Sequence, residues 1–165
     1  MEQLPGTDIN IALTTAPADL EWCARLMAAN EPWITLQRGY EDSLRLLLEP
    51  ISDVYVLTRD HERIGFVVIK LKGSFTGYIQ CVAIDRPFRR QGIGKIAIRY
   101  IESLIFRTSP NVFVCVSSFN SDARRLYQKI GYETIGVLRD YIVAGHDEIL
   151  MRKTSGPLQE FAIKS

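Results

Sequence analysis

The stretch Arg86–Ile105, RPFRRQGIGKIAIRYIESLI, joins a basic, glycine-containing loop to a regular apolar pattern. From Ile93 onward, apolar residues recur at offsets of 0, 3, 4, 7, 8, 11 and 12, which is the spacing of one helix face. Gly92 and Gly94 stand where that helix begins, and the first N–H groups of a helix have no partner within it. The stretch therefore predicts either a phosphate site at a helix start or a solvated turn.

Two common phosphate-binding motifs fit this loop poorly. A Walker loop requires Ser or Thr after its lysine, and Lys95 is followed by Ile96. A dinucleotide fingerprint requires a third glycine where Ala97 stands, although alanine is sometimes tolerated there. The loop alone leaves its ligand open.

Length, composition and charge indicate an ordinary globular protein. The chain has 165 residues, of which 47% are hydrophobic and 24% are charged, so we expect a single domain over residues 1–153 and a tail over 154–165. Lys and Arg total 20 against 19 Asp and Glu, giving a net charge of +1. This balance argues against nucleic-acid and membrane partners.

Cysteine and histidine usage predicts neither a metal site nor a disulfide framework. Cys23, Cys81 and Cys115 show no metal-ligand spacing, and the two histidines lie far apart in sequence. Reduced thiols, and the lack of a signal-like start or of an apolar run long enough to span a bilayer, predict a cytoplasmic protein without a metal.

The rest of the chain alternates between strand and helix patterns, which predicts a mixed sheet with helices on its faces. The expected strands lie at 9–15, 53–59, 63–72, 78–84, 111–117, 132–138 and 147–153. The expected helices open at Pro17, cover 41–49, begin near Gly92 and cover 121–130.

Three segments resemble the GNAT superfamily of N-acetyltransferases. RRQGIG at Arg89–Gly94 matches the family's [RQ]-x-x-G-x-[GA] loop, and NSDARRLYQKIGY at Asn120–Tyr132 fits its N-x-x-A-x-x-L-Y-x-x-x-G-[FY] segment. LRDYIVAGHDEILMRK at Leu138–Lys153 is similar to the closing hairpin of ribosomal-protein alanine N-acetyltransferases. The resemblance implies an α/β (α+β) fold: a mixed, mostly antiparallel sheet of about seven strands flanked by about four helices.

The resemblance also implies acetyl-coenzyme A (acetyl-CoA) as cosubstrate. Backbone groups of the strand ending at Ile84 are expected to bind the pantetheine arm and the thioester carbonyl, and the loop to bind the diphosphate. The residues expected to contact the coenzyme are Val82, Ala83, Ile84, Arg89, Arg90, Gln91, Gly92, Ile93, Gly94, Lys95 and Asn120.

Tyr127 is the catalytic residue that the resemblance implies, as the general acid that protonates the departing thiolate. A phenol of pKa ~10 and a thiol of pKa ~8.5 are close enough for this transfer. From its helical spacing alone, Tyr127 equally fits a core aromatic, because it shares an apolar helix face with Ala123, Leu126 and Ile130.

The general base does not carry over from the resemblance. Relatives that modify ribosomal alanine have a glutamate five residues before the asparagine, and Cys115 stands there, where a thiol fits a small buried hydrophobe better than a base. Tyr78 occupies the position of a catalytic tyrosine in some relatives, and also fits an aromatic at a strand start. His146 and Glu31 are weaker candidates that also fit surface positions.

The acceptor is expected to be a primary amine, bound near Glu31, Trp33 and Tyr141, each of which also fits ordinary packing. Deprotonating a lysine amine at pH 7 costs about 4.6 kcal/mol, against about 1.1 kcal/mol for an α-amine. A missing carboxylate base therefore favours a protein N-terminal α-amine. The alternatives are a small-molecule amine (a polyamine, an amino acid or a drug) or a non-catalytic module that senses acyl-CoA; the oligomeric state is left open.

Overall fold

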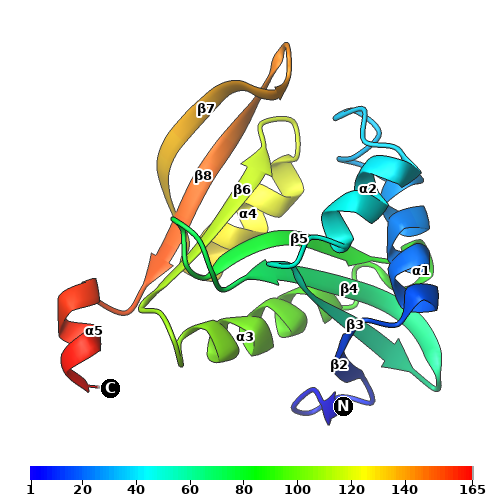
Figure 1. Ribbon diagram of the computed structural model, residues 1–165, viewed down its shortest axis with the longest axis horizontal. Helices are drawn as coiled ribbons and strands as arrows, with labels where there is room; N and C mark the ends of the chain where they lie inside the picture. Colours follow the sequence, from blue (N-terminus) through cyan, green and yellow to red (C-terminus); the bar gives the residue numbers. More distant parts are fainter. Residues whose placement is uncertain (165) are drawn as a thin grey trace.

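A computed structural model describes residues 1–164, the last three of them by backbone alone, so that Ser165 of the expected tail lies outside the described residues. The strands form one sheet in the order β1-β2-β3-β4-β5-β6-β8-β7 (Figure 1). Their bounds are β1 Glu2–Gln3, β2 Asn10–Thr14, β3 Asp53–Arg59, β4 Glu62–Lys70, β5 Tyr78–Ile84, β6 Asn111–Ser117, β7 Glu133–Val143 and β8 His146–Thr154. The helices are α1 Pro17–Ala28, α2 Tyr40–Leu47, α3 Ile93–Ile105, α4 Ser121–Lys129 and α5 Leu158–Lys164, with a 3₁₀ turn at Arg86–Phe88.

The predicted fold class is confirmed. Residues 1–164 contain eight strands and five α-helices, where about seven and about four were expected. The additional elements are the two-residue β1 and the helix α5, which forms within the expected tail. β7 runs to Val143, five residues beyond the expected strand, because it is an exposed edge strand that lacks apolar alternation.

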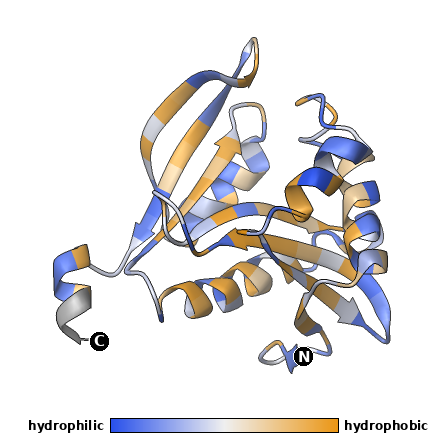
Figure 2. Cartoon of the chain, viewed as in Figure 1, coloured by the Kyte–Doolittle hydropathy of each residue, from blue (hydrophilic) through white to orange (hydrophobic). Residues whose placement is uncertain are grey.

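Helices cover both faces of the sheet and divide the core in two. α1 and α2 pack with Trp33, Phe66 and Val68 on one face, whereas α3 and α4 pack with Val67 and Ile69 on the other. Figure 2 shows apolar strands at the centre of the molecule and an α3 that is also largely apolar, whereas polar residues are prominent on α2. Alternate residues of β4 therefore contribute to different cores, as the period of a strand requires.

Every pair of neighbouring strands is antiparallel except β5 and β6, which are parallel. A parallel pair needs a crossover connection, and α3 lies in it. β5 pairs with β6 only at Tyr78 and Ile79. Beyond these residues the two strands diverge, as Figure 1 shows between the green β5 and the yellow-green β6.

An irregularity in β5 accounts for this divergence. Val68 pairs with Cys81 and the next residue, Ile69, pairs with Ile79, so that Gln80 is an extra residue opposite β4. Such a bulge bends its strand and increases the local twist. The bend falls where pairing with β6 ends, and it leaves the last part of β5 facing open space.

Candidate active site

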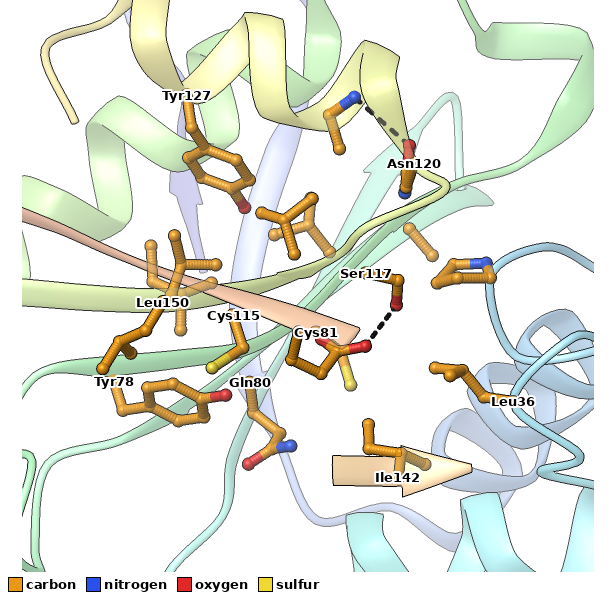
Figure 3. A pocket seen from close by; sticks show the side chains of 18 of the residues that line it. Leu36, Tyr78, Gln80, Cys81, Cys115, Ser117, Asn120, Tyr127, Ile142 and Leu150 are labelled. Carbon is orange, nitrogen blue, oxygen red and sulfur yellow. Dashed lines mark hydrogen bonds between the residues drawn. The ribbon is translucent and has the colours of Figure 1, made fainter. Parts of the chain in front are cut away.

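A cavity of about 670 Å³ occupies the region where β5 and β6 diverge. Its walls come from the connection between α1 and α2, the loop between β4 and β5, and from β5, β6, α4, β7 and β8. Figure 3 shows side chains of Tyr78, Cys115, Ser117 and Tyr127 from these elements around one space. Segments distant in sequence therefore supply one site.

The last residues of β5 form the wall expected to hold the coenzyme arm. Val82, Ala83 and Ile84 all line the cavity. They pair with β4 on one side, and among the described residues none of the three pairs with β6 on the other. Backbone groups on that open side, apart from the Ile84 carbonyl oxygen that Arg89 binds, are therefore free to hydrogen-bond a ligand.

Arg89 braces this strand rather than projecting freely into solvent. Its Nε donates to the Ile84 carbonyl oxygen at 2.7 Å and its Nη2 donates to Asn30 Oδ1 at 2.8 Å. These bonds tie the end of β5 to the residue just beyond α1. Arg89 and Gly94 are the first and last residues of the loop, and both line the cavity.

The other residues of the loop lie outside the cavity wall. Arg90, Gln91 and Gly92 are exposed, and positive φ values of 61° at Arg90 and 77° at Gly92 turn the chain into α3. Lys95 is half-buried, whereas the Ile93 side chain is buried in the core, so that only its backbone is placed to meet a ligand. The helix start itself remains the candidate phosphate site.

α4 carries two of the predicted residues into the cavity. Asn120 caps the helix by accepting a hydrogen bond from the Ala123 N–H at 3.2 Å, and Tyr127 follows two turns later (Figure 3). Tyr127 is buried, and its ring meets that of Tyr132 edge-on with centroids 5.0 Å apart. Burial raises the pKa of Tyr127, so the phenol is protonated at neutral pH and has a proton to donate, although the same shift makes it a weaker acid than an exposed tyrosine.

Tyr78 and Cys115 face each other across the base of the cavity (Figure 3). Burial, followed by the neighbouring thiol of Cys115, raises the pKa of Tyr78. Burial also raises the pKa of Cys115, although the nearby hydroxyl of Tyr78 opposes the shift. Both groups are therefore neutral at pH 7, and neither offers an anion to accept a proton.

Glu148 is a cavity residue that the sequence reasoning missed. It lies on β8, is only 3% exposed, and accepts a hydrogen bond from Ser117 Oγ at 2.6 Å, drawn as the dashed line from Ser117 in Figure 3. Burial raises its pKa, while the Ser117 hydrogen bond and the Arg38 charge oppose that shift. In the sequence, the only signal of this position is that a glutamate precedes the apolar run 149–151.

Comparison with known proteins identifies the family of this chain. Residues 16–132 match the model of the acetyltransferase (GNAT) family. The chain belongs to this family. The predicted class of activity, an N-acetyltransferase, is thereby confirmed.

Two curated relatives of this GNAT acetyltransferase match most of its length. N-alpha-acetyltransferase RimI of Mycobacterium tuberculosis is 28% identical over 151 residues, which cover 88% of this chain and 91% of that protein. An uncharacterised protein of Mycobacterium leprae is 29% identical over 149 residues, which cover 85% of this chain but 39% of that protein.

Solved structures share the fold. The ribosomal-protein-S18-alanine N-acetyltransferase of Escherichia coli has a TM-score of 0.72 at 15% identity, covering 90% of this chain and 95% of its own. Spermidine N-acetyltransferase of Vibrio cholerae has a TM-score of 0.69 at 14% identity, covering 94% and 98%. The fold is therefore compatible with more than one class of amine.

The residues expected to bind the acceptor come from two segments that border the cavity, the α1–α2 connection and β7. Glu31 is exposed and accepts hydrogen bonds from the backbone N–H and the hydroxyl of Thr35. Trp33 is buried in the core beside α1, and Tyr141 is 64% exposed at the cavity rim. His146 meets the Phe119 ring edge-on and is not among the residues that line the cavity.

Two further properties concern the whole described chain. No helix within residues 1–164 combines the length and apolar composition needed to cross a membrane. Nor do the described His, Cys, Asp and Glu side chains gather in threes that would hold a metal ion.

Proposed function

We propose that this GNAT acetyltransferase transfers the acetyl group of acetyl-CoA to the α-amine of a protein N-terminus. The observation that carries the proposal is the meeting, in one cavity, of the open edge of β5 and the protonated Tyr127 hydroxyl. The open edge supplies N–H groups for an acyl oxygen, and the phenol supplies a proton for the leaving sulfur. Both are required for direct transfer from a thioester to an amine.

The cosubstrate is assigned to the wall formed by β5, the basic loop and α4. Backbone N–H groups near Val82 and Ala83 polarise the thioester carbonyl, and the start of α3 holds the diphosphate. Asn120 lies beside the coenzyme arm at the start of α4. Tyr127 then faces the departing thiolate and protonates it.

The charges of the cavity favour an α-amine over a polycationic acceptor. Arg38, Lys70 and Lys72 line it, against the carboxylates Glu31 and Glu148. Lys70 is ion-paired with Glu49 at 2.6 Å, but the Arg38 charge opposes the rise that burial causes in the pKa of Glu148, and so acts on the cavity itself. A polyamine with several positive charges meets repulsion there, whereas a peptide brings a single amine that is readily deprotonated. The name of the M. tuberculosis relative points the same way.

The test is a steady-state assay of free coenzyme A released from acetyl-CoA. The acceptors are short peptides with varied N-terminal residues, together with N-terminally blocked lysine peptides, spermidine and an aminoglycoside. We expect turnover on a peptide α-amine and a loss of 10²- to 10³-fold in kcat for Tyr127→Phe, with the Kd for coenzyme A changed less than about twofold.

Tyr132→Phe is the matched control, because it removes the hydroxyl of the ring packed against Tyr127. Tyr132 is not among the residues that line the cavity, so we expect its variant to keep activity within about twofold. Preferred turnover of spermidine or of lysine side chains would replace the N-terminal acceptor by a small or side-chain amine. Tight coenzyme A binding without any turnover would favour the sensing module.

A further inference from the structure

We infer that Glu148 is the general base of this reaction, supplied by β8 in place of the carboxylate that β6 lacks. The inference rests on the proposed function in that it assumes amine acetylation in this cavity. It names the residue that takes the amine proton, which neither the family match nor the relatives assign.

The pairing of β6 with β8 carries the inference. Cys115, where the family resemblance leads us to expect glutamate, lies opposite Leu150, and Ser117 lies opposite Glu148. Cys115 and Ser117 are two residues apart, so their side chains point to the same face of the sheet, as Figure 3 shows. A carboxylate is therefore present on this face, one strand away and two residues further along.

Glu148 is held in place rather than loosely exposed. Its Oε1 accepts the Ser117 hydroxyl hydrogen at 2.6 Å, a short bond of the kind that charged acceptors form. The residue is 3% exposed and still lines the cavity. A fixed carboxylate at the cavity wall lies where it can reach an amine bound in the cavity, which proton abstraction requires.

The groups around Glu148 do not compete with it for the amine proton. Those that face it or its side of the cavity are Tyr78 and Cys81 from β5, Cys115 and Ser117 from β6, Arg38 before α2, and Tyr141 from β7. Burial raises the pKa of Cys81 to about 12 and raises those of Tyr78 and Cys115 as well, so all three are protonated at neutral pH. Arg38 is a permanent cation.

Burial gives Glu148 the basicity that the reaction needs. Desolvation raises its pKa above the ordinary value of 4.5, while the Ser117 hydrogen bond and Arg38 limit the rise. A carboxylate whose pKa lies above the ordinary value is a better proton acceptor for an amine than an exposed one. Ser117 is therefore a positioning residue that also adjusts the pKa of the base.

The proton movements balance. The neutral amine nitrogen attacks the thioester carbonyl and becomes cationic, and Glu148 takes its proton as the C–S bond breaks. Tyr127 gives its hydroxyl proton to the departing sulfur. The proton on Glu148 then returns to the Tyr127 oxygen through solvent, so that both residues regain their starting states.

The experiment compares pH profiles of kcat/KM for the native chain, Glu148→Gln, Glu148→Asp and Ser117→Ala. Each is assayed on whichever amine of the panel the native chain acetylates, so that a wrong acceptor class overturns the proposed function without invalidating the test of Glu148. For Glu148→Gln we expect a loss of 10²- to 10³-fold and an acid limb that follows the pKa of the amine substrate alone. Glu148→Asp keeps a carboxylate, so we expect it to retain more of the rate than Glu148→Gln does.

Ser117→Ala separates a base from a merely structural carboxylate. Because the hydrogen bond from Ser117 lowers the pKa of Glu148, its removal moves the acid limb to higher pH. Asp147→Asn is the matched control: it removes a carboxylate from the adjacent residue, which lies outside the cavity wall, and leaves the limb unmoved.

Folding is monitored through Tm and the Kd for coenzyme A. The raised pKa means that ionised Glu148 costs stability at neutral pH, so Glu148→Gln should keep or increase Tm. A Glu148→Gln variant that retains kcat/KM within about threefold, with an unchanged acid limb, would overturn the inference.

Discussion

Tyr127 and Tyr132 are neighbouring aromatic residues with different environments at their hydroxyl groups. Their rings meet edge-on, but only Tyr127 lines the cavity. The Tyr132 hydroxyl is buried near the Glu102 carboxylate but makes no hydrogen bond of ordinary geometry among the described residues. After burial, the nearby charge of Glu102 is the next cause that raises the pKa of Tyr132. The ring of Tyr132 thus packs against Tyr127, while its hydroxyl contributes little to the stability of the fold.

We therefore predict that Tyr132→Phe leaves the free energy of unfolding unchanged or raises it by up to about 1 kcal/mol. The variant keeps the ring and removes a buried polar group that lacks a partner. Urea unfolding followed by circular dichroism measures the difference. A loss of more than about 1.5 kcal/mol would show that the hydroxyl makes a hydrogen bond that the structure does not contain.

At the scale of elements, one carboxylate ties α1 to the sheet beside it. Asp19, in the first turn of α1, accepts hydrogen bonds from Thr14 Oγ1 at 2.6 Å and from Arg63 Nε at 2.7 Å. Burial would raise the pKa of Asp19, but these two hydrogen bonds and the Arg63 charge lower it below 3.8. α1 carries the connection that borders the acceptor side of the cavity.

Asp19→Asn should destabilise the chain by about 1 kcal/mol at pH 7, because a partly buried ion pair is replaced by a weaker neutral bond. A lowered native pKa stabilises the fold at pH values above the unfolded pKa, and this contribution is lost as the pH falls through the native value. The difference between native chain and variant should therefore shrink below about pH 3.5. Urea unfolding at neutral and acidic pH measures it. An equal difference at both pH values would contradict the assignment.

The start of β5 depends on a close approach between two strands. Gly77 has a φ of 87°, and a Cβ there would lie 2.4 Å from the Asn111 carbonyl oxygen. This contact is with backbone, which cannot move aside as a flexible side chain can. The pairing of β5 with β6, and with it the point at which the two strands diverge, therefore requires glycine here.

Gly77→Ala should cost at least about 2 kcal/mol of unfolding free energy, from the positive φ and the backbone clash together. Gly136→Ala is the control, because no atom lies within 4 Å of the added Cβ and φ is not positive there. We expect the control to change stability by less than about 0.5 kcal/mol. Thermal unfolding of both variants tests the contrast, and similar losses in both would contradict it.

For the whole molecule, the cavity is bounded by two parts of the sheet that hardly pair with each other. β5 and the connection between α1 and α2 form one side, and β6, β8 and β7 form the other (Figure 1). A ligand that contacts both sides binds the folded chain but not the unfolded one. Its binding energy is therefore added to the stability of the whole fold.

Coenzyme A at about 100 times its Kd should stabilise the protein by about 2.7 kcal/mol, which raises Tm by roughly 5–10 °C for a chain of this size. Because basic residues surround the loop, the Kd should rise with ionic strength. Differential scanning fluorimetry over a coenzyme series at two salt concentrations measures both effects. An unchanged Tm at saturating coenzyme would contradict the proposed site.

Residues close in sequence made much of the fold predictable. The start of α3 at Ile93 follows from Gly92 and the apolar spacing, and Asn120 caps α4 through a bond to a residue three positions on. The strands at 78–84 and 111–117 have the expected bounds. The long β7 was underestimated, because an edge strand exposed to solvent has no apolar alternation to mark its end.

By itself, the sequence determined the family, the helix that presents Tyr127 and the loop that precedes α3, because these depend on residues within a few turns of one another. The tertiary structure decided the divergence of β5 from β6, which depends on the register between strands. It also decided the partner of Glu148, because Ser117 lies 31 residues away and meets it only through the pairing of β6 with β8. A strand's own residues do not specify which neighbour it faces, so the carboxylate of this cavity became visible only in the folded chain.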